Sequence, residues 1–130
     1  MNILGFDPGK DKCGLAVVDK NRQILFHQVI VSEDALQVIQ SLSKRFSVQL
    51  LVMGNQTTSK AWKAKIENCI SFQIVLVDEH NSTLEARDRY WLMYPPQGLQ
   101  KLIPQGMRIP PRPVDDIVAI LLVERYLQQV

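Results

Sequence analysis

The sequence predicts an α/β fold built on one mixed sheet. Residues 3–6, 14–18 and 23–31 have the patterns of three consecutive strands joined by short turns. Residues 48–53 and 72–77 are two further apolar strands with a helical pattern between them. Short turns join antiparallel strands, whereas a strand, a helix and a strand imply a parallel pair with a right-handed crossover. We therefore expect three antiparallel strands, followed by two strands that pair in parallel.

The first strand ends at Asp7, and the Pro8-Gly9 turn sends the chain back as residues 14–18. A carboxylate at the end of a buried strand needs a cation, a hydrogen-bond donor or water beside it. Asp7 is therefore a candidate metal ligand. The alternative is an Asx turn, in which Asp7 accepts hydrogen bonds from the amides that follow it.

The middle of the chain alternates helices and strands. Ser32 is a plausible N-cap for a helix that runs to about Phe46, and a second helix is expected from about Ser59. Gly54 stops the strand between them. The predicted core stripes of the two helices are Ala35, Leu36, Ile39, Leu42 and Phe46, then Trp62, Ile66, Cys69 and Ile70.

The last third of the chain contains two helices and an irregular loop. Ser82 and Glu85 have the spacing of a capping box, which predicts a third helix to Trp91 or Tyr94. Prolines and glycines fill residues 94–113 and leave little room for regular structure. The final helix is expected to begin near Pro113.

Composition limits the function classes. The chain has 130 residues, 46% hydrophobic content and a formal charge of +2, so we expect a single domain over residues 1–130. No apolar run reaches the roughly 20 residues that a membrane helix needs. Cys13 and Cys69 show no metal-binding spacing, and no signal-like segment precedes the first strand, so a cytoplasmic protein is expected.

Basic residues form two regions that could contact phosphates, between residues 44 and 67 and between residues 84 and 113. Solvated helix faces explain both regions equally well. The candidate nucleic-acid contacts are Lys10, Lys60, Arg87 and Arg112.

Acidic residues at three places in the chain are expected to lie at the same edge of the sheet. Asp7 and Glu79 each follow an apolar strand, and Asp115 and Asp116 stand at the start of the final helix. The carboxyl ends of strands in an open sheet form the crevice where ligands bind. Carboxylates that converge there would repel one another without a cation, and their oxygen atoms suit Mg²⁺ or Mn²⁺. Helix capping is the alternative for each residue taken separately.

Three segments resemble the signature blocks of the YqgF family, relatives of the RuvC Holliday-junction resolvases. These segments are residues 6–17, residues 77–86 and residues 114–122. The resemblance implies a ribonuclease H-like fold, with a five-stranded mixed sheet in the order 3-2-1-4-5 flanked by helices. It also implies a metal-dependent nuclease that matures the ribosomal RNA precursor, with Asp7, Glu79 and Asp115 as the catalytic metal ligands.

The chain departs from the family pattern at two places. His80 stands where the family usually has arginine, and histidine lacks the planar fork with which arginine clamps phosphate. The loop after Gly54 lacks the usual proline.

We therefore expect a nuclease that uses Mg²⁺ or Mn²⁺ on structured RNA or branched DNA, with RNA favoured by the resemblance. The alternatives are a Holliday-junction resolvase and a catalytically silent module that binds nucleic acid or protein. An actin-like or sugar-kinase ATPase fits poorly, because it needs a second domain and a phosphate loop. The sequence leaves open a homodimer and the roles of Asp78, Asp116 and the loop over residues 94–113.

Overall fold

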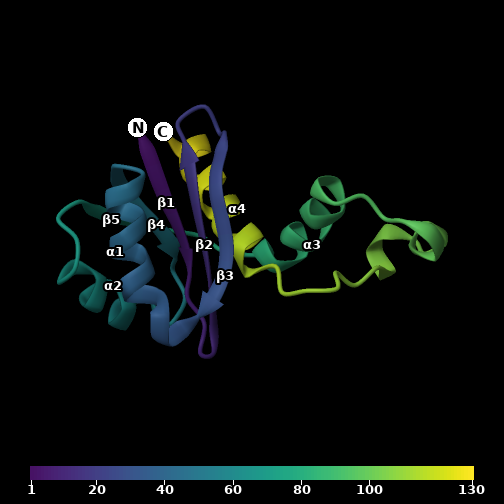
Figure 1. The fold of residues 1–130 in the computed structure, drawn as a ribbon, viewed down its shortest axis with the longest axis horizontal. Helices are drawn as coiled ribbons and strands as arrows, with labels where there is room; N and C mark the ends of the chain where they lie inside the picture. The colour runs from purple at the N-terminus through teal and green to yellow at the C-terminus, as the bar shows by residue number, and fades with distance from the viewer.

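The computed structural model describes all residues from 1 to 130 and contains one five-stranded sheet (Figure 1). Its strand order, β3-β2-β1-β4-β5, confirms the predicted topology. The first three strands form an antiparallel meander, and β4 and β5 add in parallel beside β1. The strands are β1 (Asn2–Asp7), β2 (Lys12–Asp19), β3 (Ile24–Val31), β4 (Val48–Gly54) and β5 (Gln73–Val77).

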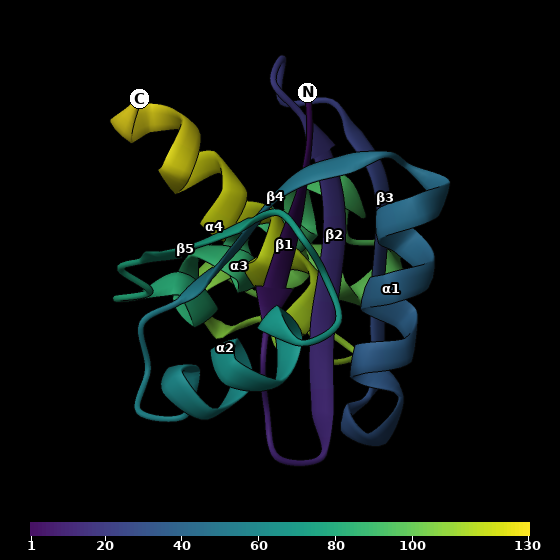
Figure 2. The ribbon, with the colours of Figure 1, turned by 90° about the vertical axis from the view of Figure 1, so that its left-hand side faces the viewer.

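Helices cover both faces of this sheet. Helices α1 (Ala35–Arg45) and α2 (Ser59–Glu67) lie on one face, in front of the strands in Figure 2, and α4 (Asp115–Gln129) lies behind them, next to α3 (Ser82–Met93). Alternate residues of the buried strands supply two apolar cores. Leu4 and Phe6 belong to the α1 side, whereas Ile3 belongs to the α4 side.

The start of the first predicted helix is wrong in detail. Ser32 begins a short 3-10 helix, Ser32–Asp34, and its hydroxyl donates a hydrogen bond to the Gly9 carbonyl at 2.8 Å. It therefore ties the helix to the turn after β1 and does not cap the helix. The Ser32 hydroxyl was expected to cap the helix, but it bonds to the turn after β1 instead, because packing brings the Gly9 carbonyl within reach.

The predicted capping box is also wrong. Helix α3 follows Asn81, which has a left-handed backbone with φ of 58°, and no side chain caps the helix. Helix α2 ends at Glu67, so Cys69 and Ile70 lie beyond the stripe on which they were predicted. The final helix, which was expected to begin near Pro113, begins two residues later at Asp115.

Residues 94–113, here called the arm, connect α3 to α4 and project away from the sheet (Figure 1). The arm contains two short 3-10 helices, η2 (Gly98–Leu102) and η3 (Gln105–Met107), as its proline content allows. None of the helices is long and apolar enough to cross a membrane.

Helix α4 packs very closely on the central strand. A Cβ atom at Gly5 would lie 2.3 Å from the Ala119 carbonyl oxygen of α4. Glycine in a strand interior marks such a close backbone approach. The glycine of β1 therefore sets how near α4 sits to the sheet.

We expect Gly5→Ala to lower the free energy of unfolding by about 1–3 kcal/mol, because the added methyl group overpacks the contact with Ala119. Urea unfolding measures the loss. The matched control is Gly106→Ala in the arm, where nothing lies within 4 Å of the added Cβ, and where we expect a change within about 0.5 kcal/mol. Equal free energies of unfolding for the two variants would contradict the prediction, because they would show that α4 can move away from β1 without loss of stability.

Candidate active site

Asp7 ends β1 on the α4 side of the sheet. Side chains alternate between faces along a strand, so Asp7 shares its face with Ile3 and Gly5. The side chain is only half-buried, because the strand ends where the α4 core ends. The predicted ligand thus stands at the rim of the apolar core.

The second carboxylate, Asp115, begins α4 and lies against the neighbouring strand β2. Gly14 is the register partner of Asp7, and a Cβ atom at Gly14 would lie 1.8 Å from the Asp115 carbonyl oxygen. No side chain fits between the strand and the first residue of α4. Glycine at position 14 therefore allows the helix to begin directly beside Asp7.

The third carboxylate, Glu79, follows β5 and lies over the end of β4, the other neighbour of β1. Phe6 pairs with Met53, so the next residue of β4, Gly54, lies level with Asp7. A Cβ atom at Gly54 would lie 2.3 Å from a carboxylate oxygen of Glu79, which follows β5. Glu79 therefore folds back over Gly54 toward the end of β1.

The electrostatics agree with this convergence. Burial, with added repulsion from Asp115 and Glu79, raises the pKa of Asp7 to about 7, against a hydrogen bond from Gln56 that lowers it. Burial raises the pKa of Asp115, and Asp116 adds to the shift, while Lys12 and the hydrogen bond with Asp7 oppose it. Asp7 and Asp115 thus lie close enough for each carboxyl group to shift the pKa of the other.

The pKa of Glu79 is also raised. Burial is the largest cause, and the Asp78 carboxylate adds to it, while the Arg125 guanidinium opposes both. Raised carboxyl pKa values, caused by burial and by like charges, are typical of functional sites.

The donor set suits a hard divalent cation, because every predicted ligand is a carboxylate. As the side chains are arranged, no three acidic, histidine or cysteine residues enclose a point where an ion could bind. The repulsion that raises these pKa values also opposes a tighter cluster, and a cation would remove that repulsion. The metal ligands Asp7, Glu79 and Asp115 stay a prediction.

Two polar residues near the site were not predicted. Gln56 follows β4, hydrogen-bonds Asp7, and also donates to the Pro8 carbonyl at 3.3 Å. Lys12 begins β2 and lies near Asp115. The parallel pairing of β4 with β1 could have identified Gln56, since the loop after β4 must pass the end of β1.

Asp116 has a different role from its neighbour. Its buried carboxylate accepts hydrogen bonds from His27 Nδ1 at 2.6 Å and from Arg112 at 3.0 Å. One residue is 100° of rotation on a helix, so Asp116 points toward β3 while Asp115 faces Asp7. The Arg112 guanidinium also lies over the rings of Tyr90 and Tyr94.

The predicted phosphate contacts lie on separate elements. Lys10 is exposed in the turn after β1, Lys60 is exposed in the first turn of α2, and Arg87 is exposed on α3. Arg112 is partly buried in its pair with Asp116, which ties the base of the arm to the sheet. His80 is exposed, and its amide donates to the Asp78 carboxylate, as in an Asx turn.

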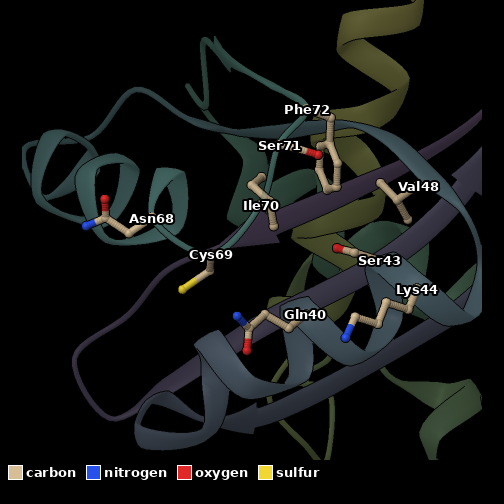
Figure 3. Close-up of a pocket in the computed structure, with 9 residues that line it drawn as sticks. All are labelled: Gln40, Ser43, Lys44, Val48, Asn68, Cys69, Ile70, Ser71 and Phe72. Atoms are coloured by element: carbon tan, nitrogen blue, oxygen red, sulfur yellow. The ribbon is translucent and has the colours of Figure 1, made fainter.

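A cavity of about 520 Å³ lies elsewhere (Figure 3). It is bounded by α1 and by the link between α2 and β5, beside Val48. Val48 starts β4 and Phe72 precedes β5, so the cavity lies at the amino ends of the parallel strands. The carboxylates lie at the opposite ends. The cavity is therefore separate from the candidate site.

The raised pKa of Asp7 predicts how stability depends on pH. Between the ordinary value of 3.8 and about 7, the native state holds a proton that the unfolded chain has lost, so stability falls as pH rises through this window. Asp7→Asn removes this loss. In metal-free buffer we expect the variant to be more stable than the wild type at pH 8, by on the order of 2 kcal/mol, and the difference to shrink toward pH 4.

Thermal or urea unfolding at several pH values measures the difference. Asp11→Asn is the matched control, because Asp11 is an exposed carboxylate of the same turn. A constant difference between Asp7→Asn and the wild type from pH 4 to 8 would contradict the assigned cause.

Comparisons with known proteins agree with this architecture. Thermus thermophilus RuvC has the same fold, with a TM-score of 0.61, 15% sequence identity, and coverage of 94% of this chain and 90% of that chain. The ROK hexokinase of the same organism has a TM-score of 0.46 and 14% identity over 70% of this chain and 37% of that chain, which supports no argument. No curated protein sequence matches. A family model described as RuvX, Holliday junction resolvase, matches residues 1–129, so the chain belongs to the RuvX family.

Proposed function

We propose that this protein hydrolyses phosphodiester bonds in structured nucleic acid with the help of Mg²⁺ or Mn²⁺. The observation that carries the proposal is the meeting of Asp7, Glu79 and Asp115 from three separate elements at one end of the sheet. Gly14 and Gly54 leave the space in which the carboxylates approach one another, although their negative charges repel. Such a cost is expected where a cation compensates it.

The residues have separable tasks in this proposal. Asp7, Glu79 and Asp115 would hold the cation, and when bound it would activate water and stabilise charge on the phosphate oxygens. Gln56 fixes the Asp7 carboxyl by a hydrogen bond. Lys12 reduces the negative potential at Asp115, which eases the approach of a phosphate.

The arm supports the choice of a nucleic acid as partner. Residues 94–113 contain no acidic residue, and Lys101 is exposed on the 3-10 helix η2. The arm leads directly into Asp115. A polyanion bound at the carboxylates would therefore run beside a segment that carries only positive charge. Lys10, which directly follows the turn after Asp7, lies where it could contact the same backbone.

Two substrates fit the proposal. The family description names Holliday junctions, which are branched DNA. The resemblance to YqgF proteins favours the ribosomal RNA precursor, which would place the protein in the cytoplasm. The three carboxylates are partly exposed, which suits the backbone of either nucleic acid.

A second candidate function is a module that binds nucleic acid without cleaving it. Two observations favour it. No group of three ligands encloses an ion as the side chains stand, and His80 is exposed where the family usually has arginine. Cleavage assays distinguish the two functions.

We expect the wild type to cleave a four-way DNA junction or a structured RNA in Mg²⁺ or Mn²⁺. Asp7→Asn and Asp115→Asn should each reduce cleavage by more than about 100-fold, beyond the loss typical of residues that only support metal ligands. Gel assays with labelled substrates measure the rates. Asp11→Asn, an exposed carboxylate of the same turn, is expected to retain the wild-type rate.

Binding of both substrates without cleavage in either metal would favour the binding module. Cleavage that survives Asp7→Asn would place the chemistry at another site.

A further inference from the structure

The turn that carries Glu79 is held from outside by one side chain of α4. Arg125 donates a hydrogen bond from Nη1 to the Asp78 carbonyl at 2.7 Å and another from Nη2 to the His80 carbonyl at 2.7 Å. These carbonyls belong to the residues immediately before and after Glu79. A single planar guanidinium therefore spans the turn.

A third contact fixes the guanidinium itself. Arg125 Nη2 lies 3.1 Å from a carboxylate oxygen of Glu85 on α3. The Arg125 side chain is 19% exposed, although its partners Asp78, His80 and Glu85 are exposed residues. Arginine suits this place because its fork presents several donors in one plane, whereas lysine offers a single point charge.

Within the turn itself, the His80 amide donates to the Asp78 carboxylate at 3.0 Å. Asn81, which ends it, has a left-handed backbone with φ of 58°, a conformation that costs energy in a residue with a side chain. The Ser82 amide donates to the Glu79 carbonyl at 3.0 Å. Without Arg125, the carbonyls of Asp78 and His80 would lose the partners that keep the turn in this conformation.

We propose that Arg125 is a positioning residue for Glu79, which it acts on through the backbone of the turn and without touching the substrate. The inference rests on the proposed function, in which Glu79 is a metal ligand. Helix α4 would then place two of the three carboxylates. It supplies Asp115 from its first residue and orients Glu79 through a side chain ten residues later.

The chain offers a matched control for a purely structural role. Arg89 of α3 makes two hydrogen bonds to the Glu124 carboxylate of α4, at 2.9 and 3.0 Å. This pair also joins α3 to α4 through a partly buried guanidinium, yet it does not touch the turn at Glu79. Arg125→Gln and Arg89→Gln should therefore lose comparable stability, while only the first releases Glu79.

The test compares wild type, Arg125→Gln, Arg125→Lys and Arg89→Gln in two measurements. Hydrogen exchange of the amides at His80 and Ser82 reports the turn, and calorimetric titration with Mn²⁺ reports the ligands without any cleavage assay. We expect Arg125→Gln to accelerate exchange at both amides and to weaken Mn²⁺ binding by about 10-fold or more. Arg125→Lys should restore only part of both, and Arg89→Gln should match the wild type in both.

If Arg125→Gln and Arg89→Gln give the same exchange rates at the turn or the same Mn²⁺ affinity, the positioning role is overturned. If the turn loosens in Arg125→Gln and Mn²⁺ affinity falls, but the wild type cleaves no nucleic acid, the inference about Arg125 holds and the nuclease function fails. The two failures are therefore distinguishable.

Discussion

The close contact between α4 and the sheet is the constraint on which the rest of the structure depends. Gly5 lets the helix backbone approach the central strand, and Gly14 lets the first residue of the helix rest on β2. A side chain at either place would lift the helix from the sheet, because the interior is closely packed and offers no room for the displaced atoms. Asp115 would then lose its place beside Asp7.

This contact also sets the electrostatic character of the site. Burial and like charge together raise the pKa values of Asp7, Glu79 and Asp115. The ionised form of each carboxyl group is therefore less stable in the folded protein than it is in water. Such a cost is tolerated only because the apolar cores on both faces of the sheet stabilise the whole domain. The three carboxylates therefore lower the stability of the metal-free protein at this end of the sheet.

The other polar contacts of α4 are organised around the same helix. Asp116 holds Arg112 and His27, and so ties the base of the arm to the edge strand β3. Toward the other end of the helix, Arg125 holds the turn after β5. Helix α4 thus acts as a rigid frame that fixes the ends of segments which by themselves have irregular backbones. The arm beyond this frame keeps its apolar side chains exposed, notably those of Leu99, Leu102, Met107 and Ile109.

The sequence by itself determined the order of elements, the strand pairing and the position of Asp7 at the end of the first strand, because periodicity and connection length are local properties of the chain. It did not reveal the uses of Ser32, Asn81 and Arg125, whose partners lie in other elements. Nor did it separate Asp115 from Asp116, since both are acidic residues in the first turn of one helix. Only the tertiary structure decided these roles, because the contact of a polar side chain depends on which backbone groups packing brings within reach.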